Sequence, residues 1–190
     1  MPFVVHIAVN GHYQAIPPSF QNTGLGTPAP SGDAPSGALG MVALKNSAEL
    51  FLSAMIFDGV FEKFPELRGI SMEHGSVWLP SWLQAIDAGA RALRKVQPHL
   101  QERELCPSER VRRNLRFAPF AGEPLGWIIE NVGPDLLVFG SDYPHPEGTS
   151  SPSERCEATM TECDQATLDA FYYRNMESVM GETIVSGQDG

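Results

Sequence analysis

The sequence predicts an α/β fold in which parallel strands form an open sheet or a barrel. Short apolar runs rich in β-branched residues alternate with longer amphipathic runs along the chain. Polar residues that can perform chemistry follow three of the apolar runs. Barrels of the (β/α)8 type place their active sites at the carboxyl ends of their strands, so these polar residues fit the same interpretation.

Four strands are expected, at residues 3–9, 69–72, 115–117 and 136–140. The first is apolar and β-branched and the last is strongly apolar, as is typical of strands buried in a parallel sheet. Between and after the strands we expect helices, at residues 38–57, 57–64, 77–95, 107–114, 124–131 and 165–180. In the helix at 77–95, apolar residues recur every three to four positions and form one face. Gly181 is expected to end the last helix.

The composition is that of one folded domain over residues 1–190, with a loop rich in glycine and proline at residues 10–37. The formal net charge of −10 argues against nucleic acid as a partner. No membrane partner is expected, because we find no run of about 18 apolar residues. The three cysteines lack the spacing of a disulfide framework or a zinc site, which favours a cytoplasmic protein with reduced thiols.

Three residues stand where chemistry is expected. His6 interrupts the first strand, His74 precedes Gly75 at the end of the second, and Asp142 follows the fourth. Two of them also have an ordinary structural explanation, His6 as a core histidine bonded to backbone and Asp142 as a carboxylate paired with a backbone N–H or an arginine. Taken together, two imidazoles and a carboxylate on separate strand ends are the donors that a metal-assisted hydrolytic site requires.

Several segments carry a resemblance to a known family. Residues 141–146 (Ser-Asp-Tyr-Pro-His-Pro) resemble the strand-eight motif of amidohydrolase-related proteins of the aminocarboxymuconate-semialdehyde decarboxylase type. Residues 73–75 (Glu-His-Gly), followed by Trp-Leu-Pro at 78–80, are similar to that family's strand-six motif and helix start. The resemblance covers most of residues 57–181 and, more weakly, residues 1–9, with further similar segments at residues 59–67, 107–114, 117–120 and 171–175.

The resemblance implies a TIM (β/α)8 barrel of the metallo-dependent hydrolase type, of which this chain supplies only the C-terminal half, strands five to eight. It implies that His6 is a metal ligand, that the catalytic residue His74 polarises substrate or moves protons, and that Asp142 is both a metal ligand and a catalytic acid–base residue. Zinc is the expected ion, with Fe(II) and Mn(II) as alternatives. His145 and Trp78 are expected to contact the substrate.

The sequence departs from the family pattern in one respect. The family opens with a His-x-His pair on strand one, and this sequence contains no such pair. The remaining histidines, His12 and His99, are interpreted as solvated. A complete barrel takes about 250 residues, so strands one to four are expected to be absent.

The function that we expect from the resemblance is metal-dependent hydrolysis of a small molecule by an activated water. Non-oxidative decarboxylation of an aromatic or unsaturated acid is the alternative within the same family, and a non-catalytic half-barrel fragment or subunit is the alternative outside it. Because a half barrel leaves two sheet edges open, we expect a homo-oligomer or a partner chain that supplies the missing half.

Overall fold

A computed structural model describes residues 1–7, 37–100, 104–143 and 149–181. Within these ranges, the sheet consists of β1 (Phe3–Val5), β2 (Gly69–Ser71) and β3 (Leu115–Phe117), arranged in the order β1-β2-β3. All pairings are parallel, and Val4, Ile70 and Arg116 stand side by side across the sheet. The predicted α/β class with parallel strands is therefore confirmed.

The predicted strand at residues 136–140 pairs less than expected. It forms a single parallel bridge, between Leu137 and Phe117, on the open side of β3. The N–H of Phe117 donates to the carbonyl of Leu136 at 2.9 Å, and the N–H of Val138 donates back to Phe117 at 3.0 Å. The next N–H, that of Phe139, donates instead to the carbonyl of Phe171 in the C-terminal helical region. A helix thus takes the hydrogen bond that would have extended the ladder.

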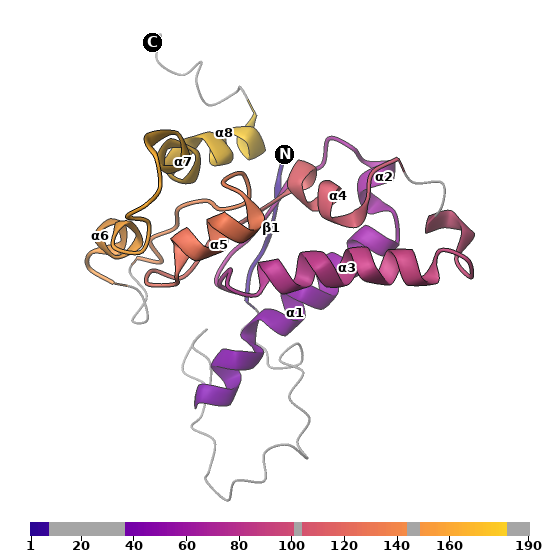
Figure 1. Cartoon of the computed structure of the whole chain (residues 1–190), viewed down its shortest axis with the longest axis horizontal. Helices are drawn as coiled ribbons and strands as arrows, with labels where there is room; N and C mark the ends of the chain where they lie inside the picture. The colour runs from indigo at the N-terminus through magenta and orange to yellow at the C-terminus, as the bar shows by residue number, and fades with distance from the viewer. Residues whose placement is uncertain (8–36, 101–103, 144–148, 182–190) are drawn as a thin grey trace, which may run out of the picture.

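The helices follow the prediction closely, with two exceptions (Figure 1). The 3₁₀ turn η2 and the short helix α6 were not predicted. The helix predicted at 165–180 contains a π-helical turn, η3, between α7 and α8, and Gly181 ends it with a positive φ, as expected. The helical bounds are α1 Gly37–Phe57, α2 Val60–Lys63, α3 Leu79–Leu93, η2 Pro98–Leu100, α4 Pro107–Asn114, α5 Leu125–Val132, α6 Pro152–Glu157, α7 Gln165–Asp169, η3 Ala170–Arg174 and α8 Asn175–Met180.

The largest core cluster joins the sheet to α1, α3, α4 and α5. At its centre, the ring of Phe117 lies edge-on to Trp78 and Trp82, with centroids 5.7 and 6.0 Å away. Such aromatic pairs contribute about 0.5–1.5 kcal/mol beyond the area they bury. The sheet is therefore anchored on one side by the apolar face of α3, the face that the sequence periodicity predicted.

Two buried asparagines fasten helices to the segments that lead into strands. The side-chain amide of Asn114, at the end of α4, donates to the carbonyls of Pro65 and Leu67 at 3.1 and 2.7 Å. The amide of Asn175, at the start of α8, donates to the carbonyl of Leu137 at 2.8 Å. Leaving a buried carbonyl without such a donor lowers the stability of the fold by about 1–3 kcal/mol. Each amide therefore holds its helix against a strand or against the segment that leads into a strand.

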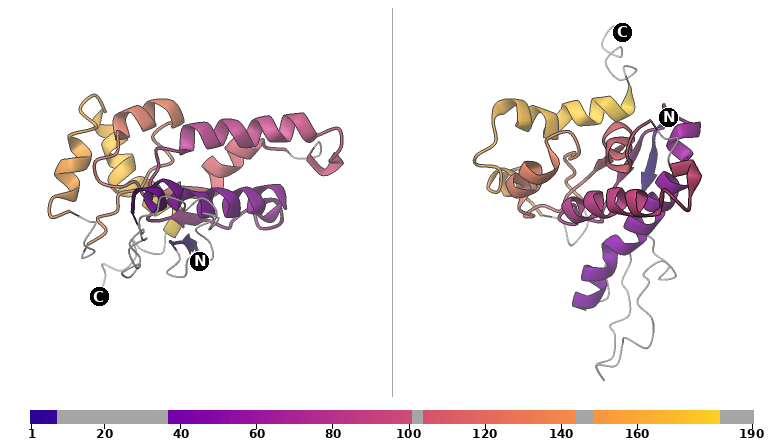
Figure 2. Two further views of the ribbon diagram at one scale, coloured as in Figure 1. Left: turned by 90° about the horizontal axis from the view of Figure 1, so that it is seen from below. Right: turned by 45° about the vertical axis from the view of Figure 1, so that its right-hand side comes forward.

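Several apolar side chains of α1 and β1 are exposed to solvent. Val42, Leu50 and Phe51 on α1 are 71%, 66% and 51% exposed, and Val4 on β1 is 54% exposed. The N-terminal half of α1 extends beyond the rest of the molecule (Figures 1 and 2). By length and composition, Ala38–Phe57 is also apolar enough to cross a membrane, contrary to our expectation, although the core helix of a soluble protein passes the same test.

Candidate functional site

The carboxyl ends of the strands carry a group of polar side chains around two adjoining cavities. Glu73, which follows β2, and Asp142, which follows the 136–140 segment, line both cavities. The cavities measure about 310 and 250 Å³ and share a wall formed by Pro119, Phe120, Gly140 and Ser141. A concave site with apolar walls and a few convergent polar groups is the usual form of a small-molecule site.

Both of these carboxylate residues have an unusual backbone conformation. Among the described residues, Glu73 (φ 60°) and Asp142 (φ 54°) are the non-glycine residues with positive φ. Residues other than glycine enter this region at a cost of about 1–3 kcal/mol, and such strain gathers at functional sites. The same backbone strain at two strand ends that share a cavity supports a functional role for this edge.

His6 lies beside Glu73 at this edge. Its Nε2 atom is 3.1 Å from Oε1 of Glu73, and its side chain is 44% exposed. Its Nδ1 atom is 3.0 Å from the carbonyl oxygen of Ile7, which can only accept a hydrogen bond. Both ring nitrogens thus face oxygen acceptors, an arrangement that fits a protonated imidazole donating from Nδ1 to Ile7 and from Nε2 to Glu73. His6 is thus a half-exposed side chain at the site and not the buried core histidine of the structural alternative.

His74 lies deeper than its neighbours. It is 3% exposed, with Nδ1 3.0 Å from the hydroxyl of Ser71. Burial lowers the pKa of His74 to about 4, the positive charge of His6 adds to the effect, and a hydrogen bond with the backbone of Met72 opposes it. The imidazole is therefore neutral at pH 7. Its Nε2 atom is buried and has no hydrogen-bond partner among the described residues, and His74 does not line either cavity.

Trp78 is a core residue rather than a wall of the site. Its side chain is 4% exposed, and its indole N–H donates to the carbonyls of His74 and Gly75 at 3.2 and 3.0 Å. The indole therefore points inward from the start of α3 and closes the turn after β2. Trp78 thus makes structural contacts within the core. Its contact with substrate stays a prediction. His145 lies outside the described residues.

Glu123 belongs to the framework of the site, and no sequence motif pointed to it. Its carboxylate accepts hydrogen bonds from the N–H and hydroxyl of Ser76 at 2.9 and 2.8 Å, and from the N–H groups of Val77 and Phe120 at 3.3 and 3.2 Å. These bonds join the loop after β3 to the loop after β2. Gly75 has a φ of 65° there, and a Cβ would stand 2.6 Å from Oε1 of Glu123. Only glycine fits this turn without displacing the carboxylate.

A model of the family described as "Amidohydrolase" matches residues 2–179. The chain belongs to the amidohydrolase family. The resemblance stated from the sequence motifs is thereby confirmed, and with it membership in a family of enzymes.

Solved structures similar to this amidohydrolase chain show the same fold in longer proteins. An amidohydrolase from Mycobacterium avium subsp. paratuberculosis K-10 is 24% identical with a TM-score of 0.72, over 95% of this chain and 42% of its own. A 5-carboxyvanillate decarboxylase from Novosphingobium aromaticivorans DSM 12444, in complex with manganese, is 22% identical with a TM-score of 0.58, over 80% and 46%. A dihydroxybenzoic acid decarboxylase from Polaromonas sp. JS666, with bound manganese, is 18% identical with a TM-score of 0.54, over 72% and 40%.

These likenesses give the amidohydrolase chain a TIM-barrel-type fold, and it spans less than half the length of each of the three proteins. The fold implies a bound metal ion, and the described residues supply only part of a metal site. In the ranges that the structure describes, no three His, Cys, Asp or Glu side chains are grouped to hold one ion. His6 and Glu73 do form a close pair of donors, and Asp142 lines the same cavities as Glu73. The edge therefore supplies one close pair of possible donors, with a further carboxylate, Asp142, on a cavity wall that Glu73 shares.

Proposed function

We propose that this chain is the C-terminal half, strands five to eight, of a metal-dependent amidohydrolase-family barrel that catalyses non-oxidative decarboxylation of an aromatic acid. The observation that carries the proposal is the cavity at the carboxyl edge of a parallel sheet, with His6 beside Glu73 and Asp142 on its wall. Decarboxylation is preferred to hydrolysis, our first expectation, because solved structures of the same fold include decarboxylases of 5-carboxyvanillate and dihydroxybenzoic acid.

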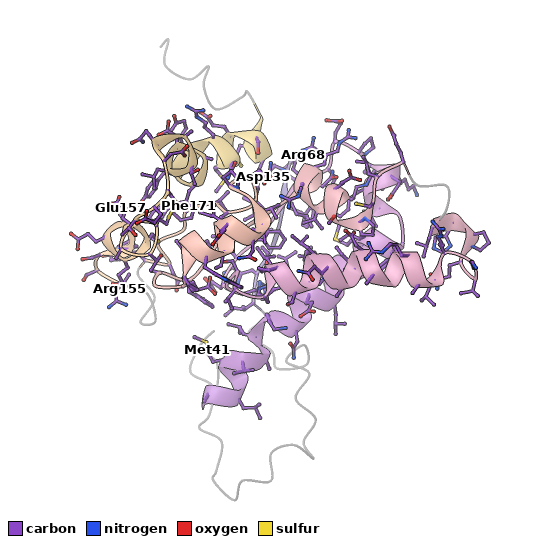
Figure 3. The ribbon with its side chains drawn as sticks, viewed as in Figure 1. Met41, Arg68, Asp135, Arg155, Glu157 and Phe171 are labelled. Atoms are coloured by element: carbon purple, nitrogen blue, oxygen red, sulfur yellow. The ribbon has the colours of Figure 1, made fainter. Side chains whose placement is uncertain are left out.

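The walls of the cavities suit a planar aromatic acid. Met72, Ala118 and Phe120 offer apolar surface to a ring. Arg155, exposed on α6, is the cationic side chain among the described residues that line the second cavity; Met41, which also lines it, lies apart from Arg155 on α1 (Figure 3). A guanidinium pairs well with a carboxylate, so Arg155 would orient the acid group of an entering substrate.

The reaction needs one proton transfer that the chain itself can supply. The bond between the ring carbon and the carboxylate breaks, CO2 leaves, and the electron pair left on the carbon takes up a proton. Asp142 is the side chain that would hold that proton, because it stands on the wall of both cavities. A divalent ion held by His6 and Asp142 would polarise the substrate, and manganese is preferred to zinc because the decarboxylase structures contain it.

The half-barrel proposal rests on the length comparison and on the exposed apolar surface. The outer members of the described sheet, β1 and the 136–138 segment, would each pair with a further strand in a closed barrel. Val4 and the exposed face of α1 would then be covered. We accordingly propose that the chain works together with a first half barrel, supplied by another chain or by further sequence. Sedimentation velocity should find it associated rather than monomeric.

The test of function is release of CO2 from a panel of hydroxybenzoic acids by the manganese-loaded chain, alone and with a first half barrel from a relative. Asp142→Asn should reduce turnover at least a hundredfold, since acid–base groups contribute about 10²–10⁴ in rate. Asp58→Asn, at an exposed position, is the matched control. Esters and amides of the same acids test the hydrolytic alternative. Turnover that Asp142→Asn leaves unchanged, or hydrolysis without CO2 release, contradicts the proposal.

A further inference from the structure

We propose that Asn175 and the π-helical turn η3 bind the free side of the 136–140 segment as a neighbouring strand would, and that Asn175 is thereby a positioning residue for Asp142. The contacts come from residues 171–175, a segment of the sequence to which the proposed function gives no role. The catalytic consequence rests on the proposed function, in which Asp142 holds the proton.

The first support is the side of the segment on which these contacts lie. In a strand, successive residues direct their N–H and C=O groups to opposite sides. The carbonyl of Leu136 and the N–H of Val138 bond to Phe117 of β3. The carbonyl of Leu137 and the N–H of Phe139 therefore face the other side, where the described sheet has no further strand.

The second support is that the C-terminal helical region fills both of these positions. The side-chain amide of Asn175 donates to the carbonyl of Leu137 at 2.8 Å, and the N–H of Phe139 donates to the carbonyl of Phe171 at 2.9 Å. In a parallel ladder, one residue of the next strand would donate to the first group and accept from the second. Asn175 and Phe171 together supply that donor and that acceptor.

The third support is the π-helical turn itself, which releases the carbonyl that Phe139 uses. In an α-helix, the N–H of Asn175 would donate to the carbonyl of Phe171, four residues before it. Here it donates to the carbonyl of Ala170, one residue further back. The carbonyl of Phe171 is therefore available to Phe139. Single π-helical turns within helices are frequent at functional sites.

Further contacts fasten the helical region to the segment. Asn175 is 7% exposed, and its amide also donates to the carbonyl of Pro134 at 2.7 Å. The ring of Phe139 packs against the rings of Phe171 and Tyr172, with centroids 5.9 and 5.2 Å away. Both the backbone and the side chain of Phe139 are thus held by the C-terminal helical region.

The position of Phe139 determines where Asp142 enters the site. Only Gly140 and Ser141 separate the two residues, and both line the two cavities together with Asp142. Asp142 has a φ of 54°, a strained conformation that persists only where the surrounding structure enforces it. The contacts of Asn175 and Phe171 supply part of that enforcement, because they fix the segment three residues before Asp142.

The test measures backbone hydrogen exchange of the whole chain by mass spectrometry of peptides. In the parent chain, the peptide covering residues 137–143 should be protected. Asn175→Ala, which removes both donors, should speed its exchange by about tenfold or more and leave the peptide covering residues 69–75 little changed. Asn175→Gln keeps the amide on a longer side chain and should act more weakly, which serves the test if Asn175→Ala does not fold. Asn131→Ala removes an exposed amide that donates to the carbonyl of Trp127 and is the matched control.

The same variants enter the CO2 assay with a first half barrel from a relative. Asn175→Ala should lower kcat by about tenfold or more and change KM by less than about twofold, because the apolar wall that receives the ring stays in place. An unprotected 137–143 peptide in the parent chain, faster exchange spread evenly over all peptides, or an unchanged kcat overturns the inference. If exchange changes as expected and no chain releases CO2, the placement of Asp142 by Asn175 stands and the proposed function fails.

Discussion

Replacing Glu123 with glutamine tests how the loop that carries His74 is held. The substitution keeps the shape of the side chain but turns one acceptor oxygen into an NH2 group. Oε1 faces the N–H groups of Ser76 and Val77, and Oε2 faces the N–H and hydroxyl of Ser76 and the N–H of Phe120. Either orientation of the amide therefore sets donors against donors.

The expected loss of stability follows from these contacts. Hydrogen bonds to a charged group contribute about 1.5–3 kcal/mol each, against about 0.5–1.5 for neutral ones. Losing the charge and at least one bond should cost Glu123→Gln about 2–4 kcal/mol. The measurement is urea unfolding followed by circular dichroism, with Glu130→Gln as the control for removal of an exposed charge. A loss below about 1 kcal/mol would refute the view that this carboxylate joins the two loops.

Two further predictions concern groups whose ionisation is shifted by burial. The pKa of His74 is lowered from 6.5 to about 4, so the unfolded chain binds a proton first as the pH falls. The free energy of unfolding of the metal-free protein should therefore fall by on the order of 3 kcal/mol between about pH 7 and pH 4 and stay level below pH 4. His74→Gln should flatten this part of the plot of unfolding free energy against pH. An unchanged plot for this variant would contradict the assignment of the lowered pKa to His74. Burial raises the pKa of the Cys156 thiol to about 11, so iodoacetamide at pH 8 should label the exposed Cys106 well before Cys156 in mass spectrometry. Equal labelling rates would show that Cys156 is accessible.

Most of the fold could be predicted because its signals are local. The apolar face of α3, the β-branched residues of β1 and the cap at Gly181 each lie within a few residues of the element they define. The pairing of residues 136–140 could not be predicted in the same way. It depends on the carbonyl of Phe171, which is distant in sequence and takes the N–H of Phe139.

The candidate site was predictable in its position and less so in its contacts. The predicted strand ends identified His6, His74 and Asp142. They did not indicate that His74 is buried beneath the edge of the sheet, or that its neighbour Glu73 faces His6. That difference arises from the positive φ of Glu73, a backbone conformation that no residue type signals here. Glu123 was missed for a related reason, because its partners Ser76 and Val77 belong to another loop.

The most direct test of the account is the position of the metal itself. Crystals of the chain soaked in Mn²⁺ would locate the ion by its anomalous scattering. We expect one strong peak at the carboxyl edge of the sheet, within about 2.5 Å of Nε2 of His6, on the side of the cavities lined by Asp142. A peak at another place on the chain, with none at this edge, would contradict it.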